Sequence, residues 1–226
     1  MERISFSSPP PAAGNVSVSD LRVSTRSSSG DGYMNIVSKT STGAVVTAPL
    51  TLTGIHFDVS LQHLEMTSLE TMGAAMRGMN QGSDLTPQQR TAKMIEAIKE
   101  PGISFLSHQP ELDIDRVSMA TAGGEARVSG VVRLQGVVPA DFAEGTDPKS
   151  LIQKLGADLD CGIDDGFLRS LPASGAQIAA QLQALADQGL FSHEKGKFQT
   201  KLAFHQGAAT FSGKTFPQAP PPALHR

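Results

Sequence analysis

The sequence predicts an α+β fold: a curved, mostly antiparallel β-sheet built from hairpins, with amphipathic helices packed on one face. Three observations predict it. Segments in which apolar and polar residues alternate come in pairs joined by glycine-rich turns. Between the pairs, apolar residues recur at helical spacing. The predicted order is hairpin, long strand, two helices, hairpin, helix, strand, helix, hairpin, so hairpins outnumber parallel crossovers.

The chain begins with a predicted hairpin and a long strand. Residues 15–25 and 33–40 alternate on either side of the turn cluster at residues 27–32. A slip of phase at Asp20-Leu21 predicts a bulge or short turn. Residues 45–66 then keep near-period-two spacing, broken at Gly54 as at a bulge.

Two helices follow this strand. Residues 69–79 carry apolar side chains at helical spacing. The second helix is predicted to begin at Thr86 as N-cap, with Pro87 at its first position and Gln89 completing a capping box. Pro101-Gly102 is expected to end it, with residues 103–106 extending the element after a break.

The second half of the chain repeats the same kinds of element. Its predicted elements are a hairpin at residues 111–120 and 126–136, a helix capped by Asp147, a strand at 156–163, a turn or short helix at 166–171, a helix from the capping box of Ser174 and Gln177 to Gly189, and a hairpin at 197–204 and 208–211. No boundary interrupts residues 15–214, so we expect one domain. Residues 1–14 are an irregular lead-in, and 215–226 a proline-rich disordered tail.

Composition excludes several classes of protein. The 226 residues include 19 Lys and Arg against 22 Asp and Glu, a net charge of −3 that argues against a nucleic-acid binder. A single cysteine excludes a disulfide framework. No apolar run approaches the roughly 20 residues that span a bilayer. The first residues lack the apolar stretch of a signal peptide.

The titratable residues do not form a recognisable catalytic or metal site. The acidic stretch of Asp158, Asp160, Asp164 and Asp165 does not fit a calcium loop, and Asp158 and Asp160 are expected to face solvent while Leu159 points inward. His56 and Asp58 share a strand face, and His63 could lie nearby. These side chains could form a metal or acid–base site, but a solvent-exposed strand face is the favoured interpretation. Cys161 has no basic neighbour to activate it. We therefore expect no metal, no cofactor and no enzymatic activity.

Methionine is the most informative residue type. Met is flexible and polarizable, and is common at adaptable apolar surfaces. A stripe of such residues on the predicted helices is either ordinary packing against the sheet, which helical spacing favours, or a surface for an apolar ligand or partner helix. The stripe consists of Met66, Met72, Met76, Met79 and Met94.

Two short motifs resemble the YdgA family of bacterial envelope proteins, a domain of unknown function. They are Pro-Glu-Leu-Asp-Ile-Asp at 110–115 followed by Gly124-Glu125, and the ending Gly189-Leu190 with Phe-Ser-Gly-Lys at 211–214. Ser212 stands where the family commonly has Asn. The resemblance covers residues 16–214, about the C-terminal half of a typical member. It implies a periplasmic body behind an N-terminal membrane anchor, and supplies no catalytic residues.

Two functions follow as expectations. The first is a non-enzymatic, envelope-associated scaffold or interaction domain, which predicts a filled core. The second is a binder of a lipid or other apolar ligand between the sheet and the Met-bearing helices, which predicts an apolar cavity of roughly 300–1,000 Å³. The location is periplasmic or at the inner membrane if an anchor precedes Met1, and cytoplasmic if Met1 is the natural start. An envelope protein or a lipid is the expected partner, and nucleic acid is not.

Overall fold

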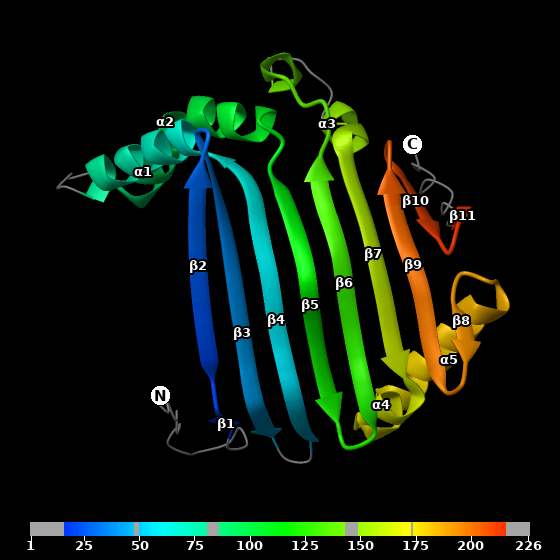
Figure 1. Cartoon of the computed structure of the whole chain (residues 1–226). Coiled ribbons are helices and arrows are strands. Elements are labelled where there is room, and N and C mark those ends of the chain that lie inside the picture. Colours follow the sequence, from blue (N-terminus) through cyan, green and yellow to red (C-terminus); the bar gives the residue numbers. More distant parts are fainter. Residues whose placement is uncertain (1–15, 48–49, 81–85, 143–148, 173, 216–226) are drawn as a thin grey trace.

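The computed structural model describes residues 16–47, 50–80, 86–142, 149–172 and 174–215 (Figure 1). They form one open sheet of eleven strands with helices against it. The strands are β1 Ser17–Ser19, β2 Arg22–Gly30, β3 Tyr33–Thr47, β4 Leu50–Glu65, β5 Glu111–Thr121, β6 Gly124–Leu134, β7 Leu155–Asp164, β8 Ser192–Glu194, β9 Lys197–His205, β10 Ala208–Phe211 and β11 Lys214–Thr215. The helices are α1 Met66–Asn80, α2 Pro87–Ser107, the short 3-10 helix η1 Pro139–Phe142, α3 Lys149–Lys154, α4 Asp165–Ser170 and α5 Gly175–Asp187.

The sheet is a meander. Its order is β1-β3-β4-β5-β6-β7-β9-β10-β11, with β2 also on β3 and β8 also on β9, and every pairing in the described part is antiparallel. Figure 1 shows the long strands side by side in this order. The predicted α+β class with an antiparallel sheet built from hairpins is confirmed.

Two predicted irregularities in the first strands are confirmed. Asp20 has a φ of 52° and separates β1 from β2. Gly54 has a φ of 54°, and the register between β4 and β5 shifts between Thr53 and His56. Glycine adopts this left-handed backbone at no steric cost, which is why the break in the pattern falls there.

The predicted start of the long strand at residue 45 is wrong, because β3 extends to Thr47 and β4 begins at Leu50. Residues 45–47 do not begin a new strand but end β3, where Val45 pairs with Leu52 of β4. Both strands keep the same apolar–polar alternation on either side of residues 48–49, which lie outside the described residues. Periodicity alone therefore does not reveal where β3 ends and β4 begins.

Helix α2 does not stop at Pro101. It begins as predicted, with the capping box of Thr86 and Gln89, but continues through Pro101 to Ser107. A proline inside a helix removes one backbone hydrogen bond and favours a kink. Here the residues beyond it gain contacts with the sheet, because Phe105 lines a cavity described below.

The predicted cap of the helix at 175–187 is also wrong. Ser174 is in helical conformation, with φ −86° and ψ −19°, and makes no capping hydrogen bond. Its hydroxyl instead donates to the Pro172 carbonyl over 3.3 Å. A capping side chain needs an extended backbone at its own residue, which this turn does not allow. The predicted cap at Asp147 and the predicted lead-in at 1–14 lie outside the described residues.

The helices lie at two ends of one sheet face. At the lower end in Figure 1, α4 and α5 pack on that face, and Leu168 and Leu182 form a buried cluster with Phe198 of β9. At the other end, α1 and α2 lie over β4 and its neighbours. The prediction that helices pack on one face is confirmed, but they leave the middle of that face bare.

Candidate functional site

The two faces of the sheet differ in polarity. Paired residues on neighbouring strands share a face, and successive residues alternate between faces. One row across β3 to β9 is Ile36, Leu61, Leu112, Val132, Ala157 and Phe204. The adjacent row is Val37, Ser60, Asp113, Val131, Asp158 and Ala203. We call the side of the first row the apolar face and that of the second the polar face.

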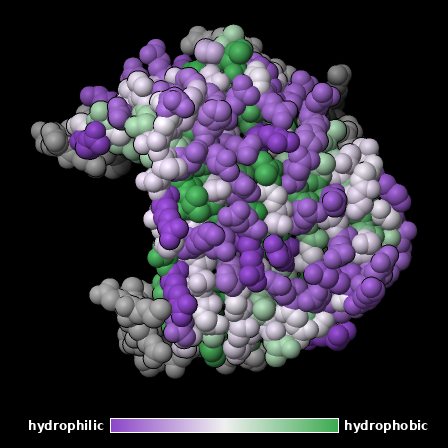
Figure 2. Space-filling model, in the orientation of Figure 1, coloured by the Kyte–Doolittle hydropathy of each residue, from purple (hydrophilic) through white to green (hydrophobic). Residues whose placement is uncertain are grey.

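The polar face carries cross-strand ion pairs. Arg133 of β6 contacts the Asp158 carboxylate of β7 at 3.0 Å, and His205 Nε2 of β9 lies 2.9 Å from the other oxygen of that carboxylate. Arg116 pairs with Glu125 at 2.9 Å. Figure 2, in the orientation of Figure 1, looks at a surface dominated by hydrophilic side chains. This face is suited to water.

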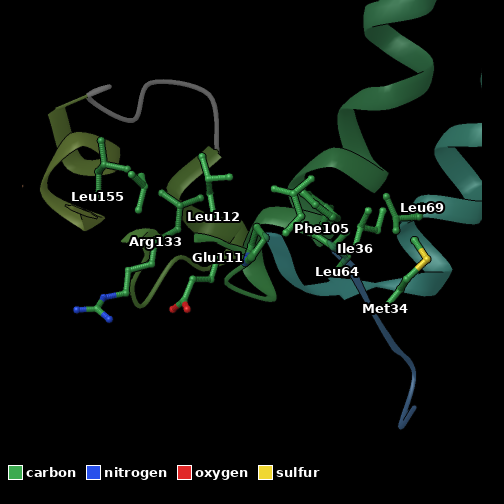
Figure 3. A pocket seen from close by; sticks show the side chains of 13 residues that line it. Met34, Ile36, Leu64, Leu69, Phe105, Glu111, Leu112, Arg133 and Leu155 are labelled. Carbon is green, nitrogen blue, oxygen red and sulfur yellow. The ribbon is translucent and has the colours of Figure 1, made fainter. Parts of the chain in front are cut away.

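A cavity of about 440 Å³ lies on the apolar face, where α1 and α2 cover the upper end of the sheet (Figure 3). Its surface is almost wholly apolar. The lining residues are Met34, Ile36, Leu61, Leu64, Leu69, Phe105, Pro110, Glu111, Leu112, Val132, Arg133, Leu134 and Leu155. In Figure 3 the charged ends of Glu111 and Arg133 point away from the apolar side chains, so the cavity presents methyl, methylene and ring carbons.

Hydrogen bonds at the start of α1 fix the roof of the cavity. The Glu65 carboxylate accepts the backbone N–H groups of Thr67 at 3.0 Å and Ser68 at 2.6 Å, and so caps the helix. The hydrogen bonds from Ser68 and Thr67 lower the pKa of Glu65 from 4.5 to about 2. The Met66 N–H donates to the Gly32 carbonyl at 3.0 Å, which ties α1 to the turn between β2 and β3. Leu69 is thereby held above the sheet.

The apolar face remains open between the two groups of helices. Phe57 of β4 is 52% exposed, Leu61 40% and Met119 of β5 38%. All three side chains lie on the apolar face by their register. Phe57 pairs with Val117, two residues before Met119, and Leu61 lies four residues along β4 from Phe57, so the three side chains occupy neighbouring positions of one face. The cavity therefore opens onto an apolar strip, which we define as Phe57, Leu61 and Met119.

Of the methionines singled out from the sequence, Met66, Met72, Met76 and Met94 are not among the residues that line this cavity. Met66, Met72 and Met94 are half-buried on α1 and α2, and Met76 is 50% exposed. Met79 belongs to α1, but its side chain lies outside what the structure describes. A different methionine, Met34 of β3, reaches the cavity.

The other candidates from the sequence remain apart from the cavity. Asp158 and Asp160 are exposed on the polar face while the intervening Leu159 is half-buried, as predicted. Burial, followed by the charge of Asp160, raises the pKa of the Cys161 thiol, the reverse of activation. His56 Nδ1 lies 4.0 Å from Asp58. His63 is not beside them but packs on Tyr33, with ring centroids 4.3 Å apart.

Neither a metal-binding cluster nor a membrane-spanning helix occurs in the described residues. Across these ranges, no group of three or more His, Cys, Asp or Glu side chains is placed to hold a metal ion. In the same part of the chain, no helix has the length and apolar character needed to cross a membrane.

The cavity residues themselves were not picked out from the sequence. In the sequence, Leu61, Leu112 and Val132 are apolar members of alternating strands, and nothing there groups them into one surface. One signal could have found them: eleven strands offer a larger apolar face than so few helices can cover. Excess sheet area predicts an exposed apolar surface.

The fold and site define a class of protein: an open antiparallel sheet with one polar face and one partly roofed apolar face. The chain belongs to the family described as bacterial protein of unknown function (DUF945), whose model matches residues 2–219. The YdgA family is a member of this group, so the resemblance drawn from the sequence is confirmed. Comparisons with curated proteins and with solved structures gave no match.

Proposed function

We propose that this protein is a non-enzymatic domain of the bacterial cell envelope that binds the acyl chain of a lipid on its apolar face. The observation that carries the proposal is the cavity of about 440 Å³ under α1 and α2. Ligand sites typically measure about 300–1,000 Å³ and are mostly apolar. Other surface grooves of this structure are as large but have more polar linings, so the apolar lining, and not the volume alone, is what supports the proposal.

The chemistry of the lining favours a hydrocarbon ligand. Leu64, Leu112 and Phe105 offer carbon surface from β4, β5 and α2. Each methylene transferred from water onto such a surface contributes about 0.8 kcal/mol. The two charged residues of the lining, Glu111 and Arg133, turn their charged ends away from the apolar side chains (Figure 3), which supports binding of a hydrocarbon.

The open strip supports the same function. A chain longer than the cavity can continue over Phe57 and Met119, which lie on the same face. The strip equally suits a scaffold that presents an apolar surface to an envelope protein. The two functions differ in what occupies the cavity, so the bound molecule decides between them.

The test is native mass spectrometry of the full chain, purified from bacterial cells, followed by organic extraction. We expect a stoichiometric fatty acid or phospholipid. The apo protein is then incubated with vesicles of phosphatidylethanolamine and phosphatidylglycerol and measured again. A clean apo mass in both experiments would overturn lipid binding and favour the scaffold. Cell fractionation of the native bacterium tests the envelope location.

A further inference from the structure

The outer edge of β2 is a long, regular and uncovered strand edge. All nine residues of β2 are exposed, and all nine pair with β3 in one register without a shift. Strand β3 is the only strand in the sheet order that β2 contacts. Along the described chain, no backbone hydrogen bond joins this outer edge to another segment. Figure 1 shows β2 at the left margin of the sheet.

The turn between β2 and β3 determines which backbone groups face outward. Asp31 and Gly32 have φ values of 54° and 82°, as in a two-residue type I′ turn. Such a turn is closed by a hydrogen-bonded pair, here Gly30 and Tyr33, and hydrogen-bonded pairs then recur at every second residue. The residues whose N–H and C=O groups point outward are therefore Val23, Thr25, Ser27 and Ser29.

The opposite edge of the sheet is protected in the way that natural sheets usually are. The outer edge of β9 is shared by the short strands β8 and β10, which have three and four residues, and β10 is followed by β11 with two. Short edge strands limit pairing with other chains. Strand β2 has neither proline nor bulge, so only this edge offers a template of useful length.

The charges on β2 select the kind of strand that can pair with it. Arg22 and Arg26 are exposed on the polar face, and neither forms an ion pair within the described residues, whereas Arg116 and Arg133 of the inner strands do. A second copy of the chain could pair with β2 through a two-fold axis at residue 25, 26 or 27. Each of these axes places Arg26 directly opposite, or diagonal to, Arg26 of the other copy. Like charges at such cross-strand positions are destabilising. An acidic strand would neutralise both arginines.

We propose that the outer edge of β2 binds an acidic, extended segment of a partner protein, which adds to the sheet as a further strand. Main-chain hydrogen bonds to the four outward residues supply the affinity of such strand addition. Arg22 and Arg26 supply the preference for glutamate or aspartate on the polar face. This site is separate from the lipid cavity, and neither proposal depends on the other.

The experiment measures amide hydrogen exchange in the full chain. The probe is a nine-residue peptide in which threonine alternates with glutamate, and the control peptide has lysine in place of glutamate. We expect the glutamate peptide to slow exchange at least tenfold at Val23, Thr25, Ser27 and Ser29, and the lysine peptide to have no effect. Equal protection by both peptides, or none by either, would overturn the proposal.

Two variants separate strand addition from mere charge attraction. Ser27→Pro removes an outward N–H without removing a bond to β3, and should abolish protection, while the matched Ser27→Val should keep it. Arg26→Glu should weaken binding of the glutamate peptide at least tenfold. If Ser27→Pro also speeds exchange at the inward amides of Arg26 and Ser28, it has disrupted the pairing of β2 with β3. The Arg26→Glu variant alone then tests the proposal. Unchanged binding in Arg26→Glu, or protection that appears in the protein alone as its concentration rises, contradicts the proposal.

Discussion

Leu61 of β4 and Leu112 of β5 lie directly opposite each other on the apolar face, at the point where the cavity opens onto the bare strip. Both line the cavity, yet Leu61 is 40% exposed. Three residues further along the same strand, Leu64 is only 3% exposed under α1. The pair therefore lies at the mouth of the cavity and not in the buried core.

Leu61→Glu should abolish lipid binding with little loss of stability. A carboxylate at the cavity mouth must be desolvated by a bound acyl chain, while in the free protein it remains in water. We expect no co-purified lipid in native mass spectrometry and a change in unfolding free energy below about 1 kcal/mol. Ile95→Glu, at a 58% exposed position of α2 that does not line the cavity, is the control and should retain lipid. Lipid retained by Leu61→Glu would place the ligand elsewhere.

Met76→Asp should leave the protein folded. Half of this side chain is exposed on α1, so its replacement should cost no more than about 0.5 kcal/mol, as at most surface sites. Leu168→Ala, in the buried cluster under α5, should cost about 2–5 kcal/mol. Urea denaturation of the two variants checks the difference. Unfolding of Met76→Asp would show that the methionine stripe is core after all.

Glu65→Ala should destabilise the protein by about 1 kcal/mol at pH 7, the usual effect of losing a helix cap. The pKa of Glu65 is about 2 in the folded state, lowered from 4.5, the ordinary value for a glutamate side chain. Because the folded pKa is the lower one, the stabilisation is complete above pH 4.5 and is lost as the pH falls towards 2. Thermal melts of both proteins at pH 7, 4 and 2.5 should converge at low pH. A gap that stays constant with pH would mean that the charged carboxylate is not the cap.

Asp158→Asn combined with Asp160→Asn should change stability little, and equally with calcium or with a chelator. Asp158 contacts Arg133 and His205, but these pairs lie at the surface, where such interactions typically contribute about 0–1 kcal/mol. Melting temperatures in calcium chloride and in EDTA provide the measurement. A calcium-dependent rise in the unmodified protein, absent from the double variant, would reveal a metal site on the polar face.

Much of the fold could be predicted because its information is local. The hairpin of β5 and β6 and the strand β7 were found within one or two residues of their observed bounds, since alternation and glycine turns specify them. Errors arose where tertiary contacts override local signals. Helix α2 continues through Pro101, and Phe105 beyond it lines the cavity. At 48–49 the alternation on both sides outweighed a local signal in the sequence, Pro49, which argues against a central strand.

The sequence predicted the type of candidate site but not the residues that line it. An apolar cavity between sheet and helices was one of two expected arrangements, but the methionines chosen for it lie elsewhere. Helical spacing identifies which residues share a helix face and not where that face is placed on the sheet. The tie between Met66 and Gly32 sets that placement, and it joins residues more than thirty positions apart. No pattern along the chain encodes such a contact.

The meander also has a consequence for synthesis. Each strand from β4 to β7 pairs with the strand that precedes it in the chain. Its partner has therefore already been synthesised when the strand leaves the ribosome. The hairpin pairs β3–β4 and β5–β6 have low sequence separation, which favours rapid pairing, whereas β4 and β5 must pair across helices α1 and α2. The growing sheet displays its apolar face from the first hairpins onward, and the completed chain still does so over Phe57 and Met119. A molecule bound over this face would therefore also keep the folded sheet from meeting a second apolar surface.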